Sequence, residues 1–235
     1  MDINTSIKKY KNSVTRKYIS ISNDEIDTIK KGDYWLSKKF DGQLWFYCKS
    51  NKSSKIINSN ENDISNIIKD IKNDLDNKFS KSKNIILAGE LYFLSNERER
   101  YGDTISGLGD NEKKKKLRLG IFDVVESDKL LSNFEDKYKF LKKNISQKQK
   151  DFSHVLEHKK IKHSEIKKSF KDIVEKKDAE GIIIRNESII YKIKKEETAD
   201  LLITGYTLGS RANQIRSISL GVFLNEKEIM HVGSC

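Results

Sequence analysis

Apolar residues recur along the chain in short runs separated by charged and polar segments. Two of these runs, NIILAGELYFL at 84–94 and LRLGIFDVVE at 117–126, predict buried strands. Aromatic residues flank the turn dipeptide Asp41-Gly42, so residues 33–48 are predicted to form two short strands around a turn. Further strands are predicted at 180–186, 189–195, 199–205, 218–225 and 228–232.

Helical spacing of apolar residues appears in other segments. Residues 62–79 carry such a stripe, formed by Ile64, Ile67, Ile68, Ile71 and Leu75. Amphipathic helices are also predicted at 132–145 and 164–176, and a short helix near Asp24–Lys31. The rest of residues 1–30 reads as polar, and residues 95–116 read as a charged loop.

Helices and strands are interspersed without a regular βαβ rhythm. The chain also lacks phosphate-binding loops of the GxxxxGK[ST] and GxGxxG kinds. The predicted fold class is therefore α+β with mainly antiparallel sheets.

The composition gives the chain a strong net positive charge. Lys and Arg number 46 and Asp and Glu 35, which gives a formal net charge of +11. Such a field favours a polyanionic partner such as nucleic acid, although a Lys-rich surface that only keeps the protein soluble explains it equally well. Cys48 and Cys235 suggest neither a metal site nor a disulfide framework. With no apolar run of membrane length and no signal core, we expect an intracellular protein of the cytoplasm, nucleoid or nucleus, with no membrane partner.

Five segments place a charged or aromatic residue on a strand that is otherwise apolar, which is costly unless the residue is paired or functional. Each also has an ordinary structural explanation: a surface lysine before a turn, solvent-facing carboxylates, the polar face of a strand, or a core phenylalanine. The segments are KFDG with Lys39 and Asp41, AGEL with Glu90, IFDVV with Phe122 and Asp123, EGIII with Glu180, and YKIKK with Lys192 and Lys194.

Taken together and in this order, the five segments resemble the motifs of ATP-dependent DNA and RNA ligases and mRNA capping enzymes. KFDG resembles the KxDG nucleophile motif, AGEL the DGEL motif, EGI the EGI/EGV motif and KIK the KxK motif. Phe122-Asp123 matches the strand whose aromatic residue stacks on the nucleotide base. The later segment ADLLITGYTLGS, from residue 199, resembles the entry to the OB domain of DNA ligases. The resemblance covers about residues 30–235.

The resemblance implies an ATP-grasp-like nucleotidyltransferase (ligase adenylation) domain at 1–199, followed by a partial OB-fold at 200–235. Lys39 is then expected to become joined to AMP, with ATP and Mg²⁺ as cofactors. Lys192 and Lys194 would bind the α-phosphate and supply a positive field that favours a neutral Lys39 amine. Glu90 and Glu180 would bind Mg²⁺, Asp41 would orient the ribose or the amine, and Phe122 would stack on adenine.

Three departures from the family pattern bear on the substrate. Leu44 stands where DNA ligases usually carry Arg, as in some RNA ligases, and a Ser-Arg pair expected nearby is replaced by IINSNEN at 56–62. The segment after Asp200 suffices for two or three strands of a five-stranded OB barrel. We therefore expect a truncated barrel, or one that a protein partner completes.

The leading hypothesis is an ATP-dependent DNA ligase that seals nicks between a 5′-phosphate and a 3′-hydroxyl in double-stranded DNA. Basic stretches at Lys113–Lys116 and Lys159–Lys168 would contact the phosphate backbone. The alternatives are an RNA ligase, a capping-type guanylyltransferase, and a non-catalytic nucleic-acid-binding module that keeps a degenerate ligase fold. An unrelated basic α+β protein is a further alternative.

Overall fold

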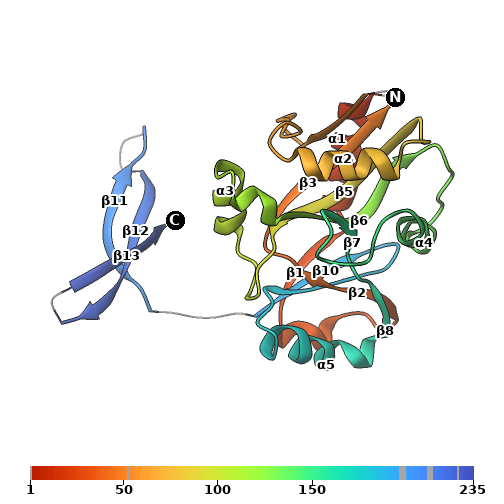
Figure 1. The fold of residues 1–235 in the computed structure, drawn as a ribbon. Coiled ribbons are helices and arrows are strands. Elements are labelled where there is room, and N and C mark those ends of the chain that lie inside the picture. Colours follow the sequence, from red (N-terminus) through yellow and green to blue (C-terminus); the bar gives the residue numbers. More distant parts are fainter. Residues whose placement is uncertain (1, 52, 196–199, 211–213, 227) are drawn as a thin grey trace. The chain divides into compact units, whose positions relative to one another are not determined.

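A computed structural model describes residues 2–51, 53–195, 200–210, 214–226 and 228–235 of the chain. The chain divides into two compact units, residues 1–195 and 196–235, and each is described by itself (Figure 1). None of the helices in these described segments is both long and apolar enough to span a membrane.

The first unit contains two five-stranded sheets, here called sheet A and sheet B. Sheet A has the order β1-β10-β9-β2-β8. Its strands are β1 (Tyr18–Ser22), β2 (Asp33–Lys39), β8 (Lys159–Lys162), β9 (Gly181–Arg185) and β10 (Ile190–Lys194). Sheet B has the order β4-β3-β5-β6-β7. Its strands are β3 (Gln43–Ser50), β4 (Ser53–Ile57), β5 (Asn84–Phe93), β6 (Leu117–Ser127) and β7 (Ser153–Val155).

Most neighbouring strands are antiparallel, and the pairs β1–β10 and β6–β7 are parallel. The predicted α+β class with mainly antiparallel sheets is thus confirmed. Helices accompany both sheets. They are α1 (Ile3–Thr15), α2 (Lys69–Lys78), α3 (Tyr101–Gly109), α4 (Phe134–Asn144) and α5 (Ile166–Phe170), with 3₁₀ turns η1 (Asp24–Thr28), η2 (Lys113–Lys116) and η3 (His163–Glu165) and a π-helical turn η4 (Lys171–Glu175).

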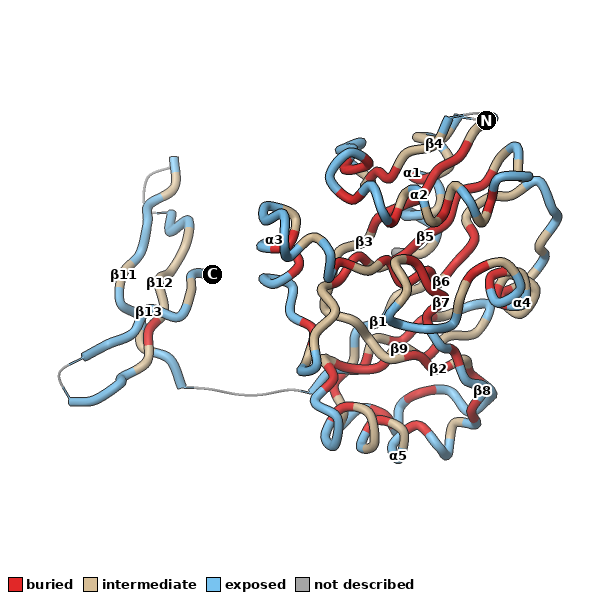
Figure 2. Tube along the Cα trace, viewed as in Figure 1, coloured by how far each residue is buried: buried red, intermediate tan, exposed pale blue. Residues whose placement is uncertain are grey.

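Sheet B is covered on both faces because its central strand β5 is apolar on both sides (Figure 2). One face packs against α2 and α4, where Ile71 and Leu75 of α2, four residues apart, are both buried. On the other face, Ile7 of α1 packs against Phe46 and Ile86. Because α1 covers only part of this face, the rest of it is available to the site described below.

Sheet A buries one face under η1, α5 and η4. Its core includes Leu36 of β2, Ile182 and Ile184 of β9, and Ile193 of β10. These residues alternate along the strands with Lys39, Ile183 and Lys192, so the opposite face of sheet A carries a different set of side chains. That second face forms one wall of the site.

Several sequence-based expectations about local structure were wrong. Residues 3–15 form α1 because Ile3, Ile7, Tyr10 and Val14 make an apolar stripe at helical spacing, which the surrounding lysines obscure. Residues 101–109, predicted as loop, form α3 despite three glycines. A Cβ on Gly107 would lie 3.0 Å from Leu117 Cδ2, so tertiary packing against sheet B overrides the low helix propensity.

Other predicted boundaries shifted. The helix expected at 62–79 begins only at Lys69, and the helix expected at 164–176 becomes η3, α5 and the π-helical turn η4. Strands β1, β4, β7 and β8 were not anticipated, because they are short and rich in polar residues.

The second unit consists of a three-stranded antiparallel sheet, β11 (Leu202–Leu208), β12 (Ile215–Asn225) and β13 (Glu228–Ser234). The strand predicted at 199–205 starts three residues later than expected, and residue 199 lies outside the described residues. Large apolar side chains of this sheet, including Ile203, Tyr206 and Phe223, are exposed. The sheet has the two or three strands expected for part of an OB barrel, while its identity as a partial OB-fold stays a prediction.

Candidate active site

One face of sheet A gathers the lysines that the sequence singled out. Lys39, the last residue of β2, lies opposite Gly181 of β9, and Gly181 also lies opposite Lys194 of β10. Lys192 lies opposite Ile183 in the same register. Because directly opposed residues of antiparallel strands point to the same side, the three lysines share one face.

Glu180, which directly precedes β9, contacts two of these lysines. Its Oε2 accepts a hydrogen bond from Lys39 Nζ, and its Oε1 lies 2.6 Å from Lys194 Nζ. The Lys39 and Glu180 side chains are only 17% and 12% exposed. Burial acts to raise the pKa of Glu180, but hydrogen bonds from Lys194 and Lys39 outweigh it and hold the pKa below its ordinary value. The carboxylate is therefore charged and engaged by two amines.

Two glycines allow the close approaches on which this geometry depends. A Cβ on Gly181 would lie 2.3 Å from the carbonyl oxygen of Ile193 in β10. A Cβ on Gly42 would lie 2.2 Å from the carbonyl oxygen of Leu91 in β5. Both distances are far below van der Waals contact, so the EGI and KFDG segments require glycine in order to pack against their neighbouring strands.

Sheet B supplies the facing wall. Leu44 of β3 lies opposite Glu90 of β5, on the face that α1 leaves uncovered, and Phe122 of β6 lines the same space. Burial raises the pKa of Glu90 to about 7, although the positive charge of Lys39 opposes this shift. Glu90 is thus a carboxylate that carries only part of its charge near neutral pH.

The two walls enclose a cavity of about 260 Å³, here called the nucleotide cavity after the ligand that the sequence resemblance predicts for it. Burial lowers the pKa of the Lys192 amine, and the nearby Lys39 and Lys194 charges lower it further. Lys192 Nζ also lies 3.9 Å from the ring centroid of Tyr18. The cavity is lined by Tyr18, Ser37, Lys38, Lys39, Phe40, Leu44, Glu90, Phe122, Leu156, His158, Ile183, Arg185, Ile190 and Lys192.

The end of this cavity away from Lys39 is held by a cross-sheet ion pair. Asp123 of β6, which is 2% exposed, lies 3.5 Å from Arg185 of β9 and 3.3 Å from Lys137 of α4. Tyr10 of α1 donates a 2.9 Å hydrogen bond to the same carboxylate. Asp123 therefore joins sheets A and B, and its neighbour Phe122 is left to line the cavity.

The predicted site residues divide into three groups. Lys39, Glu90, Phe122 and Lys192 line the nucleotide cavity. Glu180 and Lys194 join them through the ion pairs to Glu180. Asp41 lies in the turn between β2 and β3, does not line the cavity, and forms no side-chain hydrogen bond or ion pair with the described part of the chain.

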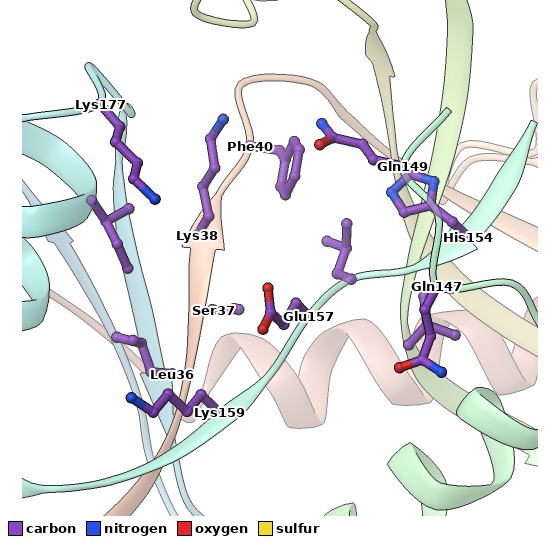
Figure 3. Close-up of a pocket in the computed structure, with 13 residues that line it drawn as sticks. Leu36, Ser37, Lys38, Phe40, Gln147, Gln149, His154, Glu157, Lys159 and Lys177 are labelled. Atoms are coloured by element: carbon purple, nitrogen blue, oxygen red, sulfur yellow. The ribbon is translucent and has the colours of Figure 1, made fainter. Parts of the chain in front are cut away.

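A second cavity of about 430 Å³ adjoins the first and shares Ser37, Lys38, Phe40 and Leu156 with it. Figure 3 shows Lys38, Lys159 and Lys177 on one side of this space and Gln147, Gln149 and His154 on the other. Lys38 Nζ lies 2.6 Å from Glu99 and 4.9 Å from the ring centroid of Phe40. We call this space the lysine-rimmed cavity.

Metal binding at the site can be assessed from its carboxylates. No group of three or more His, Cys, Asp or Glu side chains with metal-binding geometry occurs among the residues that the structure describes. Mg²⁺, however, is commonly held by one or two carboxylates together with waters and substrate phosphates. The charge of Glu180 contributes to the raised pKa of Glu90, so these two carboxylates are the candidates for such a site.

Comparison of the sequence with protein families decides the family. The model of the family described as "ATP dependent DNA ligase domain" matches residues 16–202, which is well over half of the chain. The chain belongs to the ATP-dependent DNA ligase family. Comparison with curated protein sequences found no match.

Solved structures of ligases share the fold at low sequence identity. The mycobacterial DNA ligase D complexed with ATP and MES is 15% identical with a TM-score of 0.57, over 86% of this chain and 66% of that chain. The bacteriophage T7 ATP-dependent DNA ligase in complex with ATP is 16% identical with a TM-score of 0.51, over 94% of this chain and 81% of that one. The Chlorella virus DNA ligase-adenylate is 16% identical with a TM-score of 0.53, over 92% of this chain and 80% of that chain.

Some ligase structures are considerably longer than the matched region. The present chain spans 66% of the mycobacterial protein and 59% of the chain of another match, Pmar-Lig_Pre, with which it has a TM-score of 0.64 and 14% identity. These comparisons establish the family and the fold of this ligase-family chain.

The residues of the nucleotide cavity that sequence reasoning missed include Tyr18, His158 and Arg185. Arg185 ends the apolar run GIIIR, so the criterion that selected Glu180 could have selected it too. Tyr18 and His158 carry no comparable signal, because each lies in a polar segment and reaches the cavity only through strand pairing or loop packing.

Proposed function

We propose that this protein is an ATP-dependent DNA ligase in which Lys39 forms a covalent bond to AMP. The observation that carries the proposal is the position of the Lys39 amine at a cavity with apolar walls, in contact with Glu180 and close to Lys192. Membership of the ATP-dependent DNA ligase family supports the same activity.

In the first step, the Lys39 amine attacks the α-phosphorus of ATP. A nitrogen–phosphorus bond forms, the bond to pyrophosphate breaks, and the proton that the amine loses passes to the solvent. Attack requires a neutral amine, so Lys39 must leave its ion pair with Glu180. Lys192 and Lys194 place positive charge where the phosphate oxygens gain negative charge, which stabilises the transition state more than the ground state.

Phe122 and Ile183, from the two opposing walls, offer apolar surfaces for the adenine base. Glu90 and Glu180 are the residues that would hold Mg²⁺ beside the phosphates, and the ion would neutralise phosphate charge. Asp41, which has no partner within the described chain, is the group available to orient the ribose or the Lys39 amine.

The polynucleotide is proposed to bind over the lysine-rimmed cavity. Lys38 lines both cavities, so a strand end held there lies beside the adenylate. Lys159 and Lys177 are exposed and suited to phosphate contacts, which position a strand without reading its sequence. AMP then passes to the 5′-phosphate of a nick, and the 3′-hydroxyl displaces it.

An RNA ligase is the second candidate, because Leu44 rather than an arginine lines the nucleotide cavity. The two activities are separated by sealing assays on pre-adenylated nicked DNA and nicked RNA of the same sequence. Residues 1–199 are proposed to act as the adenylation domain, and residues 200–235 as part of an OB-fold to which a protein partner would add strands.

Intact-mass measurement after incubation with ATP and Mg²⁺ tests the proposal. We expect a gain of one AMP in the native protein and in the control Lys31→Ala, and none in Lys39→Ala. Lys31 is an exposed lysine outside both cavities, so it controls for the loss of a positive charge. If the native protein or Lys39→Ala behaves otherwise, Lys39 is not the site of attachment.

A further inference from the structure

The end of the nucleotide cavity opposite Lys39 contains a histidine whose protonation can be deduced from one contact. His158 Nδ1 lies 2.9 Å from the carbonyl oxygen of Leu156. A carbonyl oxygen only accepts, so Nδ1 must carry the hydrogen and donate it. Burial lowers the pKa of His158 to about 4, which leaves the ring neutral at physiological pH. In a neutral ring protonated at Nδ1, Nε2 is a hydrogen-bond acceptor.

The acceptor atom faces the cavity. His158 is 8% exposed and lines the nucleotide cavity. Its Nε2 has no hydrogen-bond partner within the described segments, and the atom is not fully buried. Because His158 lines the cavity, Nε2 opens onto this space. The ring is held edge-on between Phe134 and Tyr138, with centroids 5.0 Å and 5.2 Å away. The acceptor is therefore fixed in direction.

The position of His158 along the cavity indicates which part of a bound nucleotide its Nε2 would contact. Strand β9 runs from Gly181, opposite Lys39, to Arg185, near the His158 end. Four residues of extended strand span roughly 13 Å. A nucleotide with its α-phosphate at Lys39 thus extends its base along Ile183 and Phe122 towards His158.

We propose that His158 Nε2 accepts a hydrogen bond from the 6-amino group of adenine and thereby selects ATP over 6-oxo purine nucleotides. The inference rests on the proposed function, since it requires Lys39 to mark the phosphate end. A 6-oxo purine such as guanine or hypoxanthine would bring a second acceptor against Nε2. Two facing lone pairs leave both groups unsatisfied in a buried site, which costs a factor of about 5 to 150 in binding.

The test measures rates of covalent labelling of the native protein, His158→Phe and the control His163→Gln by intact mass. Three nucleotides are compared: ATP, inosine triphosphate with a 6-oxo group, and purine riboside triphosphate with hydrogen at position 6. Phe keeps a planar aromatic ring at this position but removes the acceptor. His163 lies in η3 and outside the nucleotide cavity.

We expect the native protein and His163→Gln to react with ATP at least about 5-fold faster than with either analogue. His158→Phe should react with ATP and purine riboside triphosphate at similar rates, and its labelling by the latter shows that the variant is folded. An unchanged preference for ATP over purine riboside triphosphate in His158→Phe overturns the inference. Failure of the native protein to label with any nucleotide instead overturns the proposed function itself.

Discussion

Glu180 Oε1 lies 2.6 Å from Lys194 Nζ, and this contact joins a residue just before β9 to the end of the antiparallel neighbour β10. The other oxygen of the same carboxylate accepts a hydrogen bond from Lys39. Glu180 therefore sets the spacing between the proposed nucleophile, Lys39, and the proposed phosphate-binding residue, Lys194.

Replacement of this carboxylate should affect chemistry more than folding. We expect Glu180→Gln to slow AMP attachment by about 100-fold or more, because the variant loses both charged contacts and a candidate metal ligand. Single-turnover labelling measures the rate, and thermal unfolding monitors the fold. Glu61→Gln is a matched control, since Glu61 forms an exposed 3.5 Å ion pair with Lys8 in the same unit. Equal rates in the two variants would contradict the role of Glu180.

Glu90 should show a conflict between stability and activity. Its pKa is raised from an ordinary value of 4.5 to about 7 in the folded protein, so folding favours the protonated form. The free energy of unfolding therefore falls as pH rises from about 4.5 to 7, and the full cost is present above pH 7. We expect Glu90→Gln to be more stable than the native protein at pH 8 by about 3 kcal/mol, with little difference at pH 4.5.

Denaturant unfolding at the two pH values measures this effect, and AMP attachment should be lost in the same variant. If Glu90→Gln is less stable than the native protein at pH 8, the surroundings stabilise the charged carboxylate, contrary to the burial argument.

The close approach at Gly181 predicts a backbone-dependent loss of function. Gly181→Ala would force a Cβ to within 2.3 Å of the Ile193 carbonyl oxygen, so β9 and β10 must separate. We expect destabilisation of about 1–3 kcal/mol, as for other overpacked sites, and loss of AMP attachment as Glu180 moves. Gly102→Ala is the control. Gly102 lies in α3 with no atom within 4 Å of its added Cβ, so it should gain up to about 1 kcal/mol.

Substitutions in the lysine-rimmed cavity should weaken the DNA-dependent steps and leave AMP attachment unchanged. We expect the double variant Lys159→Ala/Lys177→Ala to attach AMP at the native rate but to bind and seal pre-adenylated nicked DNA more weakly. Its binding should also depend less steeply on salt, because fewer counterions are released. The double variant Lys8→Ala/Lys9→Ala, on α1, is the control for net charge. An unchanged salt slope would place the polynucleotide elsewhere on the protein.

The residues that the sequence identified best were charges on apolar strands. Lys39, Glu90 and Lys192 stand out because burying such groups is costly, and the structure places all three on the nucleotide cavity. The contacts of Lys39 and Lys194 with Glu180 could not be read from the sequence alone, because they depend on the register between β2, β9 and β10.

Other features could not be predicted from the sequence, because they depend on tertiary packing. Helix α3 contains three glycines and forms because Gly107 packs closely against Leu117. His158 reaches the cavity from a polar segment, and its role as an acceptor follows from a local contact with the Leu156 carbonyl that has no sequence signature. Tertiary packing decides both cases.

The ion pair between Lys39 and Glu180 has a consequence for the protein at rest. An amine that is protonated and held by a carboxylate is a poor target for the electrophiles that modify free lysines, such as cyanate and aldehydes. Only a ligand that brings its own negative charge and a competing cation can draw Glu180 away from the amine. If Lys39 is the nucleophile, we expect this contact to keep its amine unreactive until a phosphate ligand displaces Glu180.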